Sequence, residues 1–364
     1  MKSMKKLVLA GLVLLASVVV LAGCKNDSVP EVPKYTVKFS KGSNTDEVSD
    51  LPAELRVESG TVLTAEQLKS LADTVNCCFT GWYDGETEVE VGTYKVTKNV
   101  TLTAGWVEKF ITFSADSEQT LTVNVYGNYT LDDSLEYSVG GGEWKQLQAD
   151  AAISFGGAAG DLRMRGKSSK GMAKGSAEYA KIVFGYDDVK VSCSGDIRTL
   201  VDYESPTTID TSEARFSSLF KNCSVLTKAP ALPAENLADS CYASMFEGCT
   251  SLTSAPALDA ETLVDWCYTS MFSGCENLTS APALPAETLV PYCYDSMFSG
   301  CTNLNSVTML ATDISAEDCL FGWLKNVSET GTFTMAAEMD ESKFSRGTNG
   351  IPSGWTVKTY DSQQ

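Results

Sequence analysis

The chain has 364 residues, and its 47 acidic side chains outnumber its 28 basic ones, which gives a formal net charge of −19. Because a polyanion repels phosphate backbones, nucleic acid is not expected as a partner. The sequence contains no histidine. This absence excludes Ser-His-Asp and Cys-His catalysis, the usual zinc ligand sets and an imidazole pH switch.

Residues 1–23 have the pattern of a signal peptide. Three lysines precede an apolar run that ends in Leu-Ala-Gly-Cys, with the cysteine at Cys24. This ending resembles that of bacterial lipoprotein signals, which implies that Cys24 is lipidated and becomes the first residue; an ordinary signal peptide with a chance cysteine is the alternative. We expect a lipidated tether over residues 24–34. Since Lys25 is not an inner-membrane retention aspartate, we expect a surface-exposed lipoprotein of the outer membrane.

Residues 35–107 alternate apolar and polar side chains, as strands do. Thr64 and Gln67 have the spacing of a capping box and predict a short helix over 64–72. The segments Y-T-V-x-F from Tyr35, F-x-G-W-Y from Phe79 and V-x-x-N-V-T-L-T-A from Val96 resemble the internalin B-repeat, also called the Listeria-Bacteroides repeat. The resemblance implies a small β-grasp-like α+β module of a bacterial surface protein.

Residues 108–194 contain further short alternating runs and turn signals, which predict a β-sandwich spacer. This stretch holds the dense basic patch of the chain, with Arg163, Arg165 and Lys167 interleaved with glycine and serine. Two interpretations remain open. The patch is either a cationic loop that binds a sulfated or sialylated glycan, or the solvated tip of a hairpin.

Residues 195–330 contain an internal repeat of 26 residues. Two sets of cysteines follow this step: Cys223, Cys249, Cys275 and Cys301, and Cys241, Cys267, Cys293 and Cys319. Fixed-period self-similarity indicates stacked repeats, each too small to bury its own apolar face. Within one unit Leu263, Cys267 and Met271 stand at i, i+4 and i+8, which predicts a short helix against a strand.

The repeat unit carries F-x-G-C-x-x-L-T-x ahead of the expected strand and resembles the BspA-like bacterial leucine-rich repeats. The resemblance implies a C-terminal α/β leucine-rich-repeat solenoid of 26-residue coils, followed by a C-terminal cap over 331–364. The fold class expected for the whole chain is therefore multidomain: β-grasp-like module, β-sandwich spacer and α/β solenoid.

The two cysteine sets admit a buried thiol ladder or bridges between coils, since stacked strands lie within the range of Cα separations that a disulfide spans. No C-x-x-C motif and no histidine is present to lower a thiol pKa. We therefore predict free, buried thiols, with no metal and no cofactor.

Aromatic residues recur in register with the cysteines. Tyr242, Tyr268 and Tyr294 occur in successive units, and this invariance favours packing. Trp266 and Tyr292 stand at a position that varies between units, so they are the better candidates for ligand contact. Together with Arg163, Arg165 and Lys167 they complete the candidate binding residues.

The expected function is adhesion: non-catalytic binding of a host or matrix protein, or of a glycan, through the repeats. One alternative is a structural spacer or envelope component without a specific ligand. Another is a glycan hydrolase with two carboxylates. The acids Glu235, Glu261 and Glu287 recur once per unit, as a scaffold feature would, and isolate no catalytic pair. No catalytic residue is predicted.

Overall fold

The computed structural model describes residues 31–42, 46, 48–347 and 350–360. The predicted signal peptide and Cys24 lie outside these residues. The described chain folds into strands and turns, with three short 3₁₀ segments and no α-helix. The strands are β1 (Lys34–Ser40), β2 (Leu55–Glu58), β3 (Thr61–Val62), β4 (Cys77–Asp84), β5 (Thr87–Glu88), β6 (Lys95–Val96), β7 (Val100–Glu108), β8 (Ile111–Ser114), β9 (Gln119–Tyr126), β10 (Glu136–Val139), β11 (Lys145–Gln146), β12 (Ile153–Phe155), β13 (Leu162–Arg165), β14 (Tyr179–Phe184), β15 (Val191–Ser194), β16 (Leu226–Lys228), β17 (Ser306–Met309), β18 (Gly331–Met335) and β19 (Trp355–Thr359). The 3₁₀ segments are η1 (Gly157–Ala159), η2 (Ile197–Leu200) and η3 (Glu341–Lys343).

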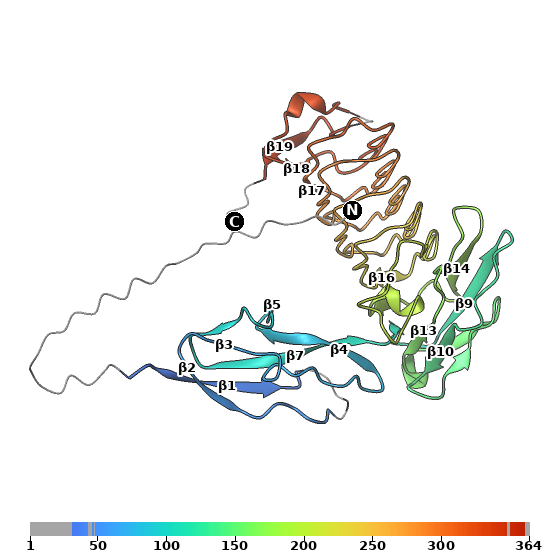
Figure 1. Ribbon diagram of the computed structural model, residues 1–364. Coiled ribbons are helices and arrows are strands. Elements are labelled where there is room, and N and C mark those ends of the chain that lie inside the picture. The colour runs from blue at the N-terminus through green and yellow to red at the C-terminus, as the bar shows by residue number, and fades with distance from the viewer. Residues whose placement is uncertain (1–30, 43–45, 47, 348–349, 361–364) are drawn as a thin grey trace, which may run out of the picture.

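The N-terminal module, residues 34–108, is built on a five-stranded sheet in the order β2-β1-β7-β4-β5 (Figure 1). The central strands β1 and β7 run parallel, and a small β3-β6 ladder lies beside the sheet. Alternating side chains such as Val37 and Leu102 point to one face and are fully buried. There they pack around Trp82, whose ring meets Phe39 edge-to-face at 4.9 Å. This core is separate from that of the rest of the chain.

The helix predicted over 64–72 is absent. The capping box itself forms, because the Gln67 amide donates to Thr64 Oγ1 at 3.4 Å and the Thr64 amide donates to Gln67 Oε1 at 2.9 Å. Only one turn follows, closed by the Leu68 amide on the Thr64 carbonyl. The motif predicted the local bonds correctly, but a capping box does not specify how far a helix continues.

The middle β-region, residues 111–194, holds a six-stranded sheet in the order β11-β10-β13-β8-β15-β16 and a three-stranded sheet in the order β12-β9-β14. Strand β16 belongs to the first repeat and pairs in parallel with β15. The Phe113 ring lies 6.0 Å from Phe184 and 6.2 Å from Phe220 of the repeats. One hydrophobic core therefore runs from Ile111 to Trp355, and the middle β-region covers the first coil of the repeats.

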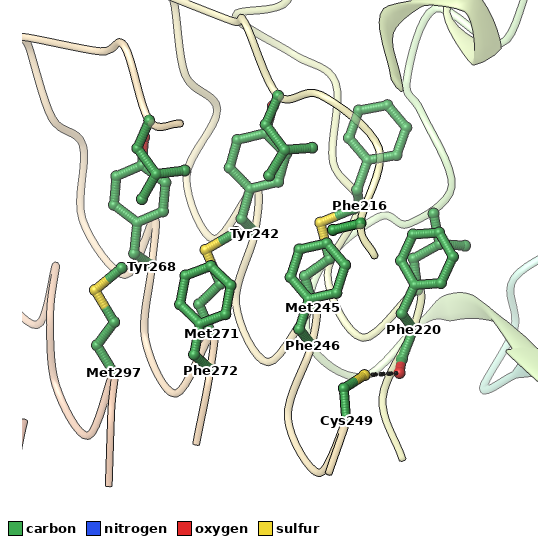
Figure 2. Packing of buried hydrophobic residues seen from close by; sticks show 14 of the residues in the cluster. Phe216, Phe220, Tyr242, Met245, Phe246, Cys249, Tyr268, Met271, Phe272 and Met297 are labelled. Carbon is green, nitrogen blue, oxygen red and sulfur yellow. Dashed lines mark hydrogen bonds between the residues drawn. The ribbon is translucent and has the colours of Figure 1, made fainter. Parts of the chain in front are cut away.

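The repeat stack, residues 214–327, is a column of 26-residue coils (Figure 1). Equivalent rings lie directly above one another. Figure 2 shows two such columns, and their parallel rings are 5.4–5.7 Å apart in one and 5.9–6.1 Å apart in the other. The columns are Phe220, Phe246, Phe272 and Phe298, and Phe216, Tyr242, Tyr268 and Tyr294.

Each coil closes with a string of four-residue turns. The Met245 amide donates within its own coil to the Tyr242 carbonyl at 3.1 Å, whereas the Tyr242 amide donates to the Cys267 carbonyl of the next coil at 3.0 Å. This alternation repeats along the string. Every fourth residue, such as Ser244 at φ 55° and Gly248 at φ 73°, has a left-handed backbone.

The predicted fold class is therefore wrong. The described chain is almost entirely strand and turn, its sheets are several and open, and no helices line the repeats, so it is not an α/β leucine-rich-repeat solenoid. The physical reason lies in the backbone. A right-handed helix cannot pass through an L-residue in the left-handed region at every fourth position. The buried stripe of Leu263, Cys267 and Met271 is real, but turns of four residues place i, i+4 and i+8 on one side just as a helix does.

The C-terminal end of the stack is closed by β17, β18 and β19, which pair in parallel in that order. Phe333 of β18 is fully buried between Trp323 of the last coil and Phe344, with ring centroids at 5.8 and 5.1 Å. These residues extend the apolar core to Trp355 of β19.

Candidate functional site

The outer edge of the repeat stack presents the candidate binding residues Trp266 and Tyr292. Both stand at the first left-handed position of their turn strings, with φ of 61° and 57°. The Trp266 amide donates to the Pro291 carbonyl at 3.2 Å, and the Tyr292 amide donates to the Glu317 carbonyl at 3.0 Å. The Thr269 hydroxyl adds a 2.7 Å bond to the Tyr292 carbonyl. Inter-coil hydrogen bonds thus fix both side chains at one edge.

The two rings stack face to face. Their centroids are 3.9 Å apart and their planes differ by 9°. This separation is shorter than in the buried columns, and Trp266 remains 40% exposed, whereas Tyr268 two residues further on is 2% exposed. We call Trp266 and Tyr292 the aromatic edge. It offers a rigid flat surface to an incoming group, because each ring restrains the other.

Carboxylates surround the aromatic edge. Asp265 precedes Trp266, Asp318 lies in register with Tyr292 one coil further on, and a hydrogen bond with Glu317 raises the pKa of Tyr292. Partial burial raises the pKa of Asp295, and the negative charge of Asp318 adds to that shift. No basic side chain is among the groups that shift these two pKa values. The potential at this edge is therefore negative.

An exposed aromatic surface among carboxylates suits a cationic group. A guanidinium or ammonium placed over an indole face gains a cation–π attraction of about 0.5–1 kcal/mol at an exposed site, and nearby carboxylates add charge-assisted hydrogen bonds. The acids of this edge were not singled out from the sequence. The 26-residue step does place Asp318 in register with Ser240, Trp266 and Tyr292, so that acid could have been found from the sequence.

The structure places the other candidates, Arg163, Arg165 and Lys167, in the middle β-region, where each already has intramolecular partners. Arg165 lies between Trp144 and Tyr203, with its guanidinium carbon 3.9 and 4.2 Å from the ring centroids. It also forms a 2.9 Å ion pair with Glu136. Arg163 covers the Phe110 ring at 4.6 Å, and Lys167 pairs with Glu204 at 2.5 Å.

The basic patch and the aromatic edge are thus separate groups of residues, and the patch is engaged in packing. Arg165 is only 17% exposed at its side chain, so a sulfated or sialylated glycan would have to compete with Glu136 and two aromatic rings for it. Of the two aromatic partners of Arg165, Trp144 precedes it and Tyr203 follows it in the sequence, each by tens of residues. No local sequence pattern therefore indicated these contacts.

The cysteines of the first set form a ladder of thiol donors. Three of them donate Sγ–H to the phenylalanine carbonyl of the preceding coil: Cys249 to Phe220 at 3.1 Å (Figure 2), Cys275 to Phe246 at 3.1 Å and Cys301 to Phe272 at 3.0 Å. Cys223, in the first coil, donates to the Ile182 carbonyl of the middle β-region at 3.1 Å. All the cysteines of the described residues are free, and burial raises the pKa of Cys223 and Cys301 to about 12. These thiols are poor nucleophiles because the thiolate is the reactive form.

The acids considered for hydrolysis lie in the open. Glu235, Glu261 and Glu287 are exposed, and the last two line a groove of about 1010 Å³ with Glu338 and Tyr360. Within the described part of the chain, no group of three or more histidine, cysteine or acidic side chains is placed to hold a metal ion. These three glutamates add negative charge to the repeat stack, but no structural feature marks two of them as a catalytic pair.

Comparison of the chain with protein-family models, with curated proteins and with solved structures finds no match. Across the described residues, no helix is both long and apolar enough to cross a membrane.

Proposed function

We propose that this protein is a non-catalytic adhesion protein that binds another protein through the aromatic edge of its repeat stack. The observation that carries the proposal is the face-to-face pair formed by the exposed Trp266 and the half-buried Tyr292 on a rigid row of turns. Tryptophan and tyrosine are the residues most often found at binding hot spots, because they bury a large area at a small entropic cost.

Charge selects the class of partner. The edge carries Asp265, Glu317 and Asp318, and the whole chain has a net charge of −19. A basic segment on a host or matrix protein complements this potential, whereas an anionic glycan is repelled. Cationic side chains of such a segment would lie over the indole of Trp266 and pair with the neighbouring carboxylates. A neutral glycan stacked on the same rings is the competing ligand.

The cellular setting belongs to the same proposal. The signal pattern before Cys24 supports a lipoprotein displayed on the outer membrane. Its lipid anchor would hold the chain at the membrane, and the repeat stack would present its edge to the surroundings.

The test is an array of matrix proteins and glycans probed with the mature chain and with the double variant Trp266→Ala, Tyr292→Ala. We expect binding to basic proteins, weakened at least about thirtyfold in the variant, as the loss of a hot spot of 2 kcal/mol implies. Binding should also weaken with rising salt, because screening reduces charge attraction.

A matched control exists in the same chain. Tyr126 and Tyr179 of the middle β-region are also stacked, at 5.0 Å, and Tyr126 is 39% exposed. The double variant Tyr126→Ala, Tyr179→Ala should bind as the original chain does. Equal binding by the Trp266, Tyr292 variant would disprove the proposed surface. Binding of neutral glycans alone, hydrolysis of a glycan, or no ligand at all would favour the glycan, enzyme or spacer alternatives in turn.

A further inference from the structure

A groove of about 1010 Å³ adjoins the aromatic edge of the repeat stack. Leu263 and Val290 line this groove, and they precede Trp266 and Tyr292 by three and two residues. Since an extended chain covers at most about 3.6 Å per residue, the Cα atoms of Leu263 and Trp266 lie at most about 11 Å apart. Those of Val290 and Tyr292 lie at most about 7 Å apart. The groove and the aromatic edge are therefore neighbours in two successive coils.

The groove is acidic. Among the described residues that line it, three carry carboxylates and none is basic. The three are Glu261, Glu287 and Glu338, which are all exposed and form no ion pair within 4.0 Å in the described part of the chain. By contrast, Glu247 of the turn string pairs with Lys221 of the preceding coil at 2.8 Å. The groove thus presents negative charge that the described chain does not neutralise and that a ligand can reach.

The three carboxylates form a row along the stack. Glu261 and Glu287 occupy the same position of successive coils. Thr312 takes the next level, because its amide donates to the Glu287 carbonyl at 2.8 Å, and Glu338 follows Thr312 by one more step of 26 residues. At about 4.8 Å for each level, the row spans roughly 14 Å from Glu261 to Glu338. Such a row suits several separate cations rather than one ion.

An extended basic peptide matches this row. Its alternate side chains point to one face and lie about 6.7 Å apart, so three of them span roughly 13 Å. The groove also contains Tyr360, which is 45% exposed, and the half-buried Val290 and Leu310. The aliphatic stems of lysine or arginine can pack on these side chains while the charged ends reach the carboxylates. Because like charges opposite one another are destabilising, the bound cations also relieve repulsion within the row.

We propose that the groove binds an extended basic segment in which lysine or arginine alternates with uncharged residues. The inference rests on the proposed function, since the same segment lies across the aromatic edge. Three of its cations pair with Glu261, Glu287 and Glu338. Charge disfavours a second copy of the chain as the occupant, because each copy has a formal net charge of −19.

The experiment compares two labelled peptides of identical length, composition and charge, titrated with the full mature chain and followed by fluorescence anisotropy. One is Lys-Thr repeated six times, and the other is Lys-Lys-Thr-Thr repeated three times. When extended, the first carries all its lysines on one face, whereas the second divides them between both faces and matches two carboxylates of the row instead of three. Since one exposed ion pair contributes a factor of about 1.5 to 5, we expect the alternating peptide to bind about threefold more tightly.

A triple variant removes the charge of the row at nearly unchanged side-chain size: Glu261→Gln, Glu287→Gln, Glu338→Gln. All three positions are exposed, so the replacements do not threaten the fold. The loss of three ion pairs should weaken binding of the alternating peptide about tenfold and remove its advantage over the other peptide. A matched control neutralises three exposed glutamates outside the groove and should retain that advantage: Glu66→Gln, Glu118→Gln, Glu143→Gln.

The outcomes separate this inference from the proposed function. Equal affinities of the two peptides for the original chain overturn the alternating spacing, and an unaffected groove variant overturns the groove as the binding site. If the groove variant weakens binding but the variant Trp266→Ala, Tyr292→Ala does not, the aromatic edge fails and the groove stands. A groove variant with a changed oligomeric state in sedimentation marks the groove as an interface between copies and overturns the peptide as its occupant.

Discussion

The N-terminal module and the repeat stack both bury aromatic rings without a single α-helix among the described residues, but they do so in opposite ways. In the module, Trp82 meets Phe39 and Phe79 edge-to-face, at 4.9 and 5.6 Å, and each contact occurs once. In the stack, Phe272 lies parallel to Phe246 and Phe298, at 5.6 and 5.7 Å, and the same contact recurs between Phe220 and Phe246.

This difference has an energetic consequence. The module is a closed core, so damage to it stays local. In the stack each coil is the packing surface of the next, and its stability resembles a sum of nearest-neighbour terms. A substitution in a middle coil therefore removes contacts with the coils on both sides. A change that affects every coil, such as deprotonation of the buried thiols, lowers the free energy of unfolding once for each coil.

The largest expected effect is alkaline unfolding of the stack before the module. Burial raises the pKa of Cys223, Cys293 and Cys301 to about 12, against an ordinary value of 9.0. The folded state thus favours the neutral thiol, so the stability is complete below about pH 9 and falls as pH rises toward 12. Three such thiols alone lower the free energy of unfolding by about 4 kcal/mol per pH unit in that window. Circular dichroism of the full chain against pH measures it.

The module provides the internal comparison. Among the residues of the module that the structure describes, burial raises the pKa of Cys78 and of Tyr94 to about 12, whereas the stack holds two cysteine ladders and a tyrosine column. The variant Cys223→Ala, Cys301→Ala should shift the stack transition to higher pH. Coincident loss of both regions, or no shift in the variant, contradicts the assignment of the transition to the ladder thiols.

The second prediction concerns the loss of stability when one buried aromatic ring is removed from each region. Phe272→Ala should destabilise the stack by about 3–5 kcal/mol, because a fully buried ring is lost between two neighbours and leaves a cavity. Trp82→Ala should cost the module a similar amount. Urea unfolding, followed by hydrogen exchange of the two regions, distinguishes them.

The two variants should differ in the region that loses protection from hydrogen exchange. Phe272→Ala should lower the protection of the adjoining coils and leave strands β1 and β7 unchanged, while Trp82→Ala should do the reverse. If either variant lowers the protection of both regions equally, the two cores are coupled, and the comparison drawn above fails.

The sequence predicted which residues of the stack are equivalent, but not the path of the backbone between them. The 26-residue step correctly puts Phe246, Phe272 and Phe298 in one column. The helix was wrong because the buried stripe fits both a helix and a string of four-residue turns. The distinguishing signal was the recurrence of small residues at strict steps of four, as in Ser244 and Gly248, where a helix of 3.6 residues per turn would drift.

The candidate site was partly predictable for the same reason. Trp266 and Tyr292 were singled out by their variation at one repeat position, and the structure brings their rings together. The partners of Arg165 were not predictable, because Trp144 and Tyr203 come from other parts of the chain. The missing hydrogen-bond partner of the buried Trp323 indole was likewise not predictable, because it depends on how the chain packs around that ring.

A smaller effect separates the two cysteine ladders. Cys275→Ala loses a thiol–carbonyl bond of 3.1 Å, whereas Cys293→Ala loses a contact of 4.0 Å that is at the limit of a hydrogen bond. Both thiols are fully buried, so the lost apolar volume is matched. We expect Cys275→Ala to be more destabilising by about 0.5–1.5 kcal/mol in urea unfolding. Equal losses would mean that the first ladder, like the second, stabilises by packing alone.

The smallest effect tests the turns that replace the expected helix. Ser270 has a left-handed backbone at φ 54°, and Gly322 occupies the equivalent position two coils later at φ 59°. Glycine avoids the penalty of about 1–2 kcal/mol that an L-residue incurs in the left-handed region. It also loses more conformational entropy on folding, which destabilises the folded state by about 0.5–1 kcal/mol. Ser270→Gly should therefore stabilise the stack by roughly 0.5 kcal/mol, measured as the midpoint of urea unfolding.

The reverse change sharpens this result. Gly274 follows in the same string at φ 73°, and a Cβ placed there would approach Gly248 no closer than 3.7 Å, an ordinary contact. Gly274→Ala thus adds backbone strain without a clash and should destabilise by about 1 kcal/mol. In a right-handed helix the signs of both changes would be exchanged, since there alanine is better than glycine by about 1 kcal/mol and serine is better than glycine as well. The signs of the stability changes in Ser270→Gly and Gly274→Ala therefore distinguish the string of turns from a helix.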